Sequence, residues 1–317
     1  MFQPTSGIMN QSLSQPYGDY GASKGVVRRQ RQRMNLVPVC QCLFVPWLTF
    51  CVVYAITTFR IHYDWPWACW LLVGVFSLVT LMIGTHAASN TIAKIKNEHA
   101  KEPSWTVFLF ISMVIAISLG SILGTMNFHS FMQRYYDYEN LNQYMSVDVT
   151  KMRGAELMDG GRLNFINGTN LDTRKALGFK NADTYCVAPI SMTSAKGVPA
   201  ELFTYDFWAV GVNCCSGDVS DFKCGEYNNP KARAGLRVLE DETRAFYRLA
   251  VQQAEAMFHI RADHPLFLYW GEDASEEMQS WKDEGYKFFC LALLVHFFWQ
   301  LFVVILGVLG FRKLSHF

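Results

Sequence analysis

The chain has 317 residues, a formal net charge of +1 and 51% hydrophobic residues, values that fit either a globular or a membrane protein. The distribution of the apolar residues decides between these classes. A helix needs about 20 apolar residues to cross a hydrocarbon core, so four long windows almost free of charge predict four membrane-spanning helices. The windows are Leu36–Phe59, Trp67–Ser89, Ser104–Met126 and Lys287–Phe311.

Basic residues gather in three regions that the positive-inside rule assigns to the cytosol. Residues 1–35 hold five Lys or Arg against one Asp, the 90–103 connection holds three Lys, and Arg312 and Lys313 follow the last window. We therefore expect a multi-pass integral protein of the plasma membrane or an endomembrane, with both termini in the cytosol. The expected parts are a disordered tail (1–35), helices one to three (36–126), a large extracellular or luminal domain (127–286), helix four (287–311) and a short tail (312–317).

The first and third windows contain features that are typical of membrane helices. Cys40 and Cys42 adjoin the basic tail, where S-palmitoylation is chemically accessible; ordinary membrane thiols are the alternative. The spacing of Gly120 and Gly124 allows close approach of another helix, either within the bundle or from a second protein. No Asp, Glu, Lys or Arg lies in the middle of a window, which argues against a transporter, pump or voltage sensor.

The long segment 127–286 has the composition of a water-exposed domain. It contains 23 acidic and 16 basic residues, so we expect no nucleic-acid binding. Short alternating runs across 145–235 predict strands, and apolar residues at three- and four-residue steps predict a helix over 236–263. The expected fold class is a four-helix membrane protein with a mixed α+β, disulfide-containing outer domain between helices three and four.

Four cysteines lie in this segment: Cys186, Cys214, Cys215 and Cys224. An even number in an oxidising compartment predicts two disulfides. A bond between the adjacent Cys214 and Cys215 would be strained, so we favour Cys186 bonded to one of them and Cys224 to the other. A redox enzyme is not expected without a Cys-x-x-Cys motif. We also expect no metal site, because an adjacent pair fits a zinc tetrahedron poorly.

Two further features of the segment concern its surface. Asn167-Gly168-Thr169 is a glycosylation sequon in a polar turn, whereas Asn10-Gln11-Ser12 lies in the tail that we expect to be cytosolic and unglycosylated. Trp208, Phe267 and Trp270 are candidate contacts for a partner, with core packing as the alternative.

The predicted helices are separated by a short first outer loop, a short inner loop and one large outer loop. The large loop contains Cys214-Cys215-Ser216-Gly217, and Glu284-Gly285-Tyr286 precedes the last helix. This pattern resembles the tetraspanin family, whose Cys-Cys-Gly motif is matched with one inserted residue and whose Glu-Gly-Cys motif is matched except at Tyr286. The chain departs from that family in placing Cys186 ahead of the motif, in its longer outer loop and in lacking the polar residues usual in helices one and three. The resemblance implies lateral organisation of membrane partners without catalysis, and palmitoylation of juxtamembrane cysteines.

No nucleophile–base or paired-carboxylate pattern in the sequence has the spacing of a catalytic site, so we expect neither an enzyme nor a cofactor. We predict an integral membrane protein that organises or recognises partner proteins through its outer domain. The expected partners are membrane lipids and other membrane proteins, and a small-molecule substrate is not expected. The alternatives are a constitutive subunit of a large membrane complex, or a channel or its auxiliary subunit.

Overall fold

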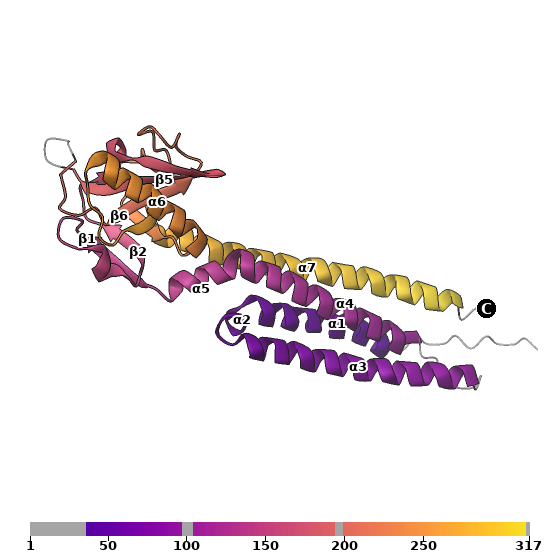
Figure 1. Cartoon of the computed structure of the whole chain (residues 1–317). Coiled ribbons are helices and arrows are strands. Elements are labelled where there is room, and N and C mark those ends of the chain that lie inside the picture. Colours follow the sequence, from indigo (N-terminus) through magenta and orange to yellow (C-terminus); the bar gives the residue numbers. More distant parts are fainter. Residues whose placement is uncertain (1–35, 97–103, 194–198, 315–317) are drawn as a thin grey trace, which may run out of the picture. The chain divides into compact units, whose positions relative to one another are not determined.

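The structure is a computed structural model that describes residues 36–96, 104–193 and 199–314. Its helices include four with apolar stretches long enough to cross a membrane, which suggests a multi-pass membrane protein (Figure 1). The tail at 1–35, expected to be disordered, lies outside the described residues. The four long helices are α1 (Leu36–Thr58), α3 (Pro66–Lys96), α4 (Ser104–Asn127) and α7 (Ala274–Leu314).

Small residues bring α1 and α4 together. A Cβ added at Gly124 would overlap the Thr57 hydroxyl, and one added at Gly120 would lie 3.2 Å from Val53. The Thr57 hydroxyl oxygen also lies 3.3 Å from the Gly120 carbonyl oxygen. Both glycines of the Gly-x-x-x-Gly pattern therefore face α1 inside the bundle, where their missing side chains allow close backbone approach.

Two helices extend beyond their apolar windows. A π-helical turn, η1 (Phe128–Met132), carries α4 into α5 (Gln133–Glu139), and α7 begins at Ala274, ahead of its apolar part. Aromatic side chains of η1 and α5 share a buried cluster with the start of α7 and with Leu236 of the sheet described next. The short helix α2 (Arg60–Asp64) lies between α1 and α3.

The region 142–271 is here called the sheet domain, and its described residues contain an eight-stranded mixed sheet between α5 and α7. The strand order is β1-β2-β7-β8-β6-β5-β3, and β4 pairs with β5. The β1/β2 and β6/β8 pairs are parallel and the others are antiparallel. This arrangement confirms a mixed α+β region between the third and fourth long helices. The strands are β1 (Asn142–Val147), β2 (Gly160–Phe165), β3 (Thr169–Leu171), β4 (Leu177–Asn181), β5 (Asp183–Met192), β6 (Phe207–Val212), β7 (Ala234–Arg237) and β8 (Leu266–Gly271).

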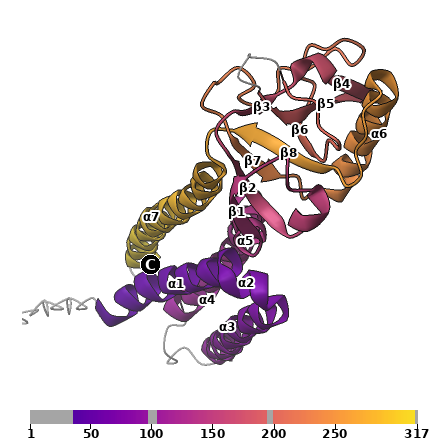
Figure 2. The same cartoon turned by 90° about the vertical axis from the view of Figure 1, so that its left-hand side faces the viewer.

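The sheet domain has a hydrophobic core on each face of the sheet. The amphipathic helix α6 (Asp241–Phe258) packs against one face, where Figure 2 shows it beside β4 and β5. Trp208 and Phe267 lie in this core, and Trp270 lies in the core on the other face. Their side chains are 0%, 7% and 5% exposed, so they pack inside the domain and are not available as the surface contacts considered from the sequence.

Candidate functional site

Two disulfides are present, joining Cys186 to Cys215 and Cys214 to Cys224. This is one of the two pairings favoured from the sequence. Cys186 on β5 faces Gly211 on β6 in the strand register, and a Cβ at Gly211 would lie 2.6 Å from the Cys224 Cβ. The glycine therefore provides the space in which the second disulfide packs against the sheet.

The disulfide region brings several cysteine sulfur atoms close together. The sulfur atoms of Cys186, Cys214 and Cys224 lie within 4.8 Å of one another. All three are bonded in disulfides, so none offers the thiolate that a metal ion requires. Together with Phe222 and Trp270 they belong to one buried core, where they hold the 213–224 loop against β5 and β6.

The candidate modification sites differ in accessibility. Cys40 is exposed, whereas Cys42 is buried with its Sγ 3.6 Å from the Trp105 carbonyl oxygen. Cys40 is therefore the more accessible of the two palmitoylation candidates. Asn167 is exposed in the turn between β2 and β3, where Arg233 donates a hydrogen bond to its side-chain oxygen. Asn10 lies outside the described residues.

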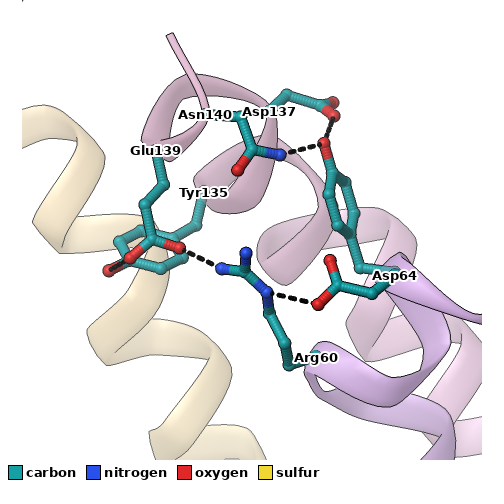
Figure 3. Close-up of polar contacts among 7 residues, drawn as sticks. Arg60, Asp64, Tyr135, Asp137, Glu139 and Asn140 are labelled. Carbon is teal, nitrogen blue, oxygen red and sulfur yellow. Dashed lines mark hydrogen bonds and ion pairs between the residues drawn. The ribbon is translucent and has the colours of Figure 1, made fainter. Parts of the chain in front are cut away.

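A polar network joins α2 to α5, as Figure 3 shows. Arg60 Nε lies 2.8 Å from Asp64 Oδ2, and its Nη1 lies 2.6 Å from Glu139 Oε2. Tyr135 donates a hydrogen bond of 2.9 Å to the same Glu139 carboxylate. Hydrogen bonding by Asp64 raises the pKa of Arg60, so the guanidinium stays charged in this network.

Tyr63 provides the second half of the network. Its hydroxyl donates to Asp137 at 2.9 Å and accepts from the Asn140 side-chain amide at 3.0 Å. Burial, and then the hydrogen bond to Asp137, raise the pKa of Tyr63, so the phenol remains neutral and able to donate. The five residues of α2 are thus fastened to the end of the third long helix by side chains of both elements (Figure 3).

A cavity of about 390 Å³, here called the junction cavity, lies beside this network where α5 and α7 meet the sheet domain. Its three carboxylates come from α5, from the connection between β7 and α6, and from α7. Arg134 is the only basic residue of its lining. Tyr269 lies among these acidic side chains. Its pKa is raised to about 12, first by burial and second by the negative charge of Glu240. The lining residues are Arg134, Asp137, Tyr138, Leu239, Glu240, Tyr269, Glu277 and Trp281.

A second, larger groove of about 640 Å³ lies among α1, α4, η1 and α7. Its lining is almost wholly apolar. The Asn127 amide donates to the Gly285 carbonyl oxygen at 3.0 Å, and the His296 ring stacks on Phe50 with centroids 4.0 Å apart. In a bilayer, a groove with this lining suits lipid acyl chains better than a polar substrate.

The junction cavity was not foreseen from the sequence. Its residues come from α5, the β7–α6 connection, β8 and α7, which are up to about 150 positions apart, and no short motif joins them. The partial signals were the aromatic residues of 127–144 and the acidic stretch 272–284. Among the described residues, no Ser, Thr or Cys side chain hydrogen-bonds a His side chain, so no nucleophile–base pair accompanies the cavity.

No protein-family model matches the chain, and no curated protein or solved structure is significantly similar to it. The four apolar helices, with a disulfide-containing mixed domain between the third and fourth, are consistent with a tetraspanin-like layout. The chemistry of the chain's own surfaces is therefore the basis for assigning a function.

Proposed function

We propose that the chain is a non-enzymatic, multi-pass membrane protein that recognises partner proteins through its sheet domain. In this proposal both termini are cytosolic and the sheet domain lies on the opposite side of a plasma membrane or endomembrane. The tetraspanin-like layout supports this view, as does the acidic composition of the domain.

The observation that carries the proposal is the way in which the sheet domain is attached. The helices α5 and α7 continue from the apolar bundle into the domain, and the Tyr138 hydroxyl donates to the Arg237 carbonyl oxygen of β7 at 2.5 Å. The Tyr138 ring also stacks on Trp281 of α7. Two helical connections, a shared buried cluster and two disulfides favour a domain that presents one fixed surface, which suits recognition better than a domain on flexible linkers.

Phe203 is the best candidate for a partner contact on that surface. Its side chain is 80% exposed, the highest exposure among the large apolar residues that the structure describes in the sheet domain. A large aromatic side chain in water is typical of contact residues in protein interfaces. Met257 on α6 is also apolar and 59% exposed, and it serves as a matched control on another element.

The test is site-specific photocrosslinking in the native membrane. A photoreactive phenylalanine analogue replaces Phe203 in one variant and Met257 in another, and the products are identified by mass spectrometry after solubilisation in mild detergent. We expect one or a few discrete adducts from position 203. We also expect the proteins found in those adducts to be lost when the Phe203→Glu variant is co-purified in parallel. A chain that purifies alone and gives no adduct from either position would contradict partner recognition.

The same experiment separates this function from its main alternative. In the parallel co-purification, an organiser of partners retains them in variable, substoichiometric amounts. A constitutive complex subunit gives a single partner retained at fixed stoichiometry.

A further inference from the structure

We propose that the junction cavity binds a small organic ammonium ion. The site would hold the cationic group among the aromatic and acidic side chains contributed by α5, the β7–α6 connection, β8 and α7. This inference concerns a ligand of the chain itself, and it does not depend on whether the sheet domain recognises another protein.

Aromatic rings form a large part of the cavity lining. Tyr138 and Trp281 stack with their ring centroids 5.5 Å apart and their planes at 27°. The hydrogen bond from the Tyr138 hydroxyl to the Arg237 carbonyl oxygen fixes this ring further, and Tyr269 adds a third ring from β8. Rings of Trp and Tyr attract organic cations through the negative potential of their faces, and alkylated ammonium groups are the characteristic ligands of such sites.

The charge of the lining points to a cation as well. Asp137, Glu240 and Glu277 contribute three carboxylates against the single guanidinium of Arg134. Asp137 accepts a hydrogen bond from Tyr63 at 2.9 Å. Among the described residues, the side chains of Glu240 and Glu277 make no hydrogen bond or ion pair, and Arg134 lies beyond ion-pair distance of every carboxylate.

Glu240 and Glu277 are exposed, so water solvates their carboxylates in the free protein. A cation in the cavity would meet carboxylates that no basic side chain already neutralises, and opposite charges attract at this distance. The raised pKa of Tyr269, which results from burial and then from Glu240, agrees with an excess of negative charge at the cavity.

The geometry fits an organic cation better than a metal ion. Calcium needs six to eight oxygen ligands at about 2.3–2.6 Å. Within the described part of the chain, the carboxylate oxygens of Asp137, Glu240 and Glu277 do not converge as a metal-binding trio, because the one trio with converging ligand atoms consists of disulfide-bonded cysteines. A volume of about 390 Å³ lies in the range of small-molecule sites, roughly 300–1,000 Å³.

The ammonium group has two possible sources with the same chemistry, a soluble metabolite or the headgroup of a choline lipid. The cavity lies at the end of α5, next to the apolar bundle, so both sources are within reach. The experiment therefore uses one cationic probe, choline, in two lipid surroundings.

The test is calorimetric titration of the purified full chain with choline chloride, with sodium chloride as the blank. The chain is reconstituted in nanodiscs of phosphatidylglycerol or of phosphatidylcholine. We expect saturable binding at one site in phosphatidylglycerol. The choline concentration at the anionic phosphatidylglycerol surface is first corrected for the negative surface potential. After that correction, equal affinity in both lipids would assign a soluble ligand, and weaker choline binding in phosphatidylcholine would assign a competing lipid headgroup. Both results support an ammonium site.

Three isosteric variants locate the site. We expect Glu240→Gln and Glu277→Gln each to weaken choline binding about tenfold, as removal of one charge at a partly exposed site should. Glu276→Gln is the matched control, because Glu276 is exposed like Glu240 and Glu277 but does not line the cavity. Thermal unfolding of each variant shows that it is folded. Absence of saturable choline binding, unchanged affinity in the Glu240→Gln/Glu277→Gln double variant, or binding of calcium in preference to choline would overturn the proposal.

Discussion

Arg60 and Glu139 join the connection between the first two long helices to the end of the third, with Nη1 and Oε2 2.6 Å apart. Their side chains are 49% and 39% exposed, so water and salt screen the pair. We expect Glu139→Gln to lower the free energy of unfolding by at most about 1 kcal/mol, and the loss to shrink as sodium chloride is added. Thermal unfolding in detergent at low and high salt measures both effects. A larger loss that is insensitive to salt would show that the pair is not an ordinary surface ion pair.

The contact between Gly124 and Thr57 predicts a strong effect of one methyl group. Gly124→Ala places a Cβ inside the space of the Thr57 hydroxyl, so α1 and α4 must separate or Thr57 must change rotamer. We expect a destabilisation of about 1–3 kcal/mol, the usual cost of overpacking a core. Gly74→Ala on α3 is the control, because a Cβ there meets no atom within 4 Å. Equal unfolding temperatures for the two variants would contradict close packing at Gly124.

The two disulfides should differ in their contribution to stability. Cys186–Cys215 closes a separation of 29 residues, whereas Cys214–Cys224 closes one of 10. The chain-entropy relation then favours the longer loop by about 1 kcal/mol. We expect the Cys186→Ala/Cys215→Ala variant to unfold at lower denaturant concentration than Cys214→Ala/Cys224→Ala, with intact mass confirming the remaining bond. The reverse order would indicate that packing around Cys224, and not loop closure, dominates.

The sequence predicts the long helices well but not their ends. Hydropathy reports the part of a helix that suits hydrocarbon, and a helix continues wherever polar residues tolerate it. The second apolar window ends at Ser89, yet α3 continues to Lys96. For the same reason, α7 begins at Ala274, well before the apolar window expected from Lys287.

In the sheet domain, the local spacing of apolar residues predicts a helix but not the residue at which it begins. The helix expected over 236–263 is observed as α6, but it begins at Asp241 because Leu236 and its neighbours form β7, which pairs with β2 and β8. Strand pairing between distant segments decided this boundary.

The junction cavity was missed for a related reason. Glu277 lies in an acidic stretch that resembles a solvated surface, and only the fold places it beside Tyr138 and Tyr269.

The raised pKa of Tyr269 predicts sensitivity to alkaline pH. Burial, and then Glu240, raise its pKa from 10.0 to about 12, which means that the fold favours the neutral phenol. The resulting stabilisation is fully present below pH 10 and is lost as the pH rises through about 12. We expect the free energy of unfolding to fall more steeply above pH 10 in the natural chain than in Tyr269→Phe. The other tyrosines titrate in both proteins, so parallel pH profiles would show that Tyr269 contributes nothing.

Asn167 provides a test of membrane topology. It is exposed in the turn between β2 and β3, whereas Thr169 of the same sequon is only 1% exposed. The folded domain buries Thr169, so the whole sequon is accessible only before β3 packs. We therefore expect a glycan to be attached during synthesis if the sheet domain enters a secretory lumen. The measurement is electrophoretic mobility after expression in eukaryotic cells, with and without glycosidase.

Asn167→Gln should abolish the mobility shift, and Asn10→Gln should leave it unchanged, because the tail is expected to be cytosolic. A glycan retained in Asn167→Gln but lost in Asn10→Gln would place the N-terminal tail in the lumen. Since an even number of spans keeps both termini on one side, that result would also place the C-terminus there and reverse the orientation proposed for the sheet domain.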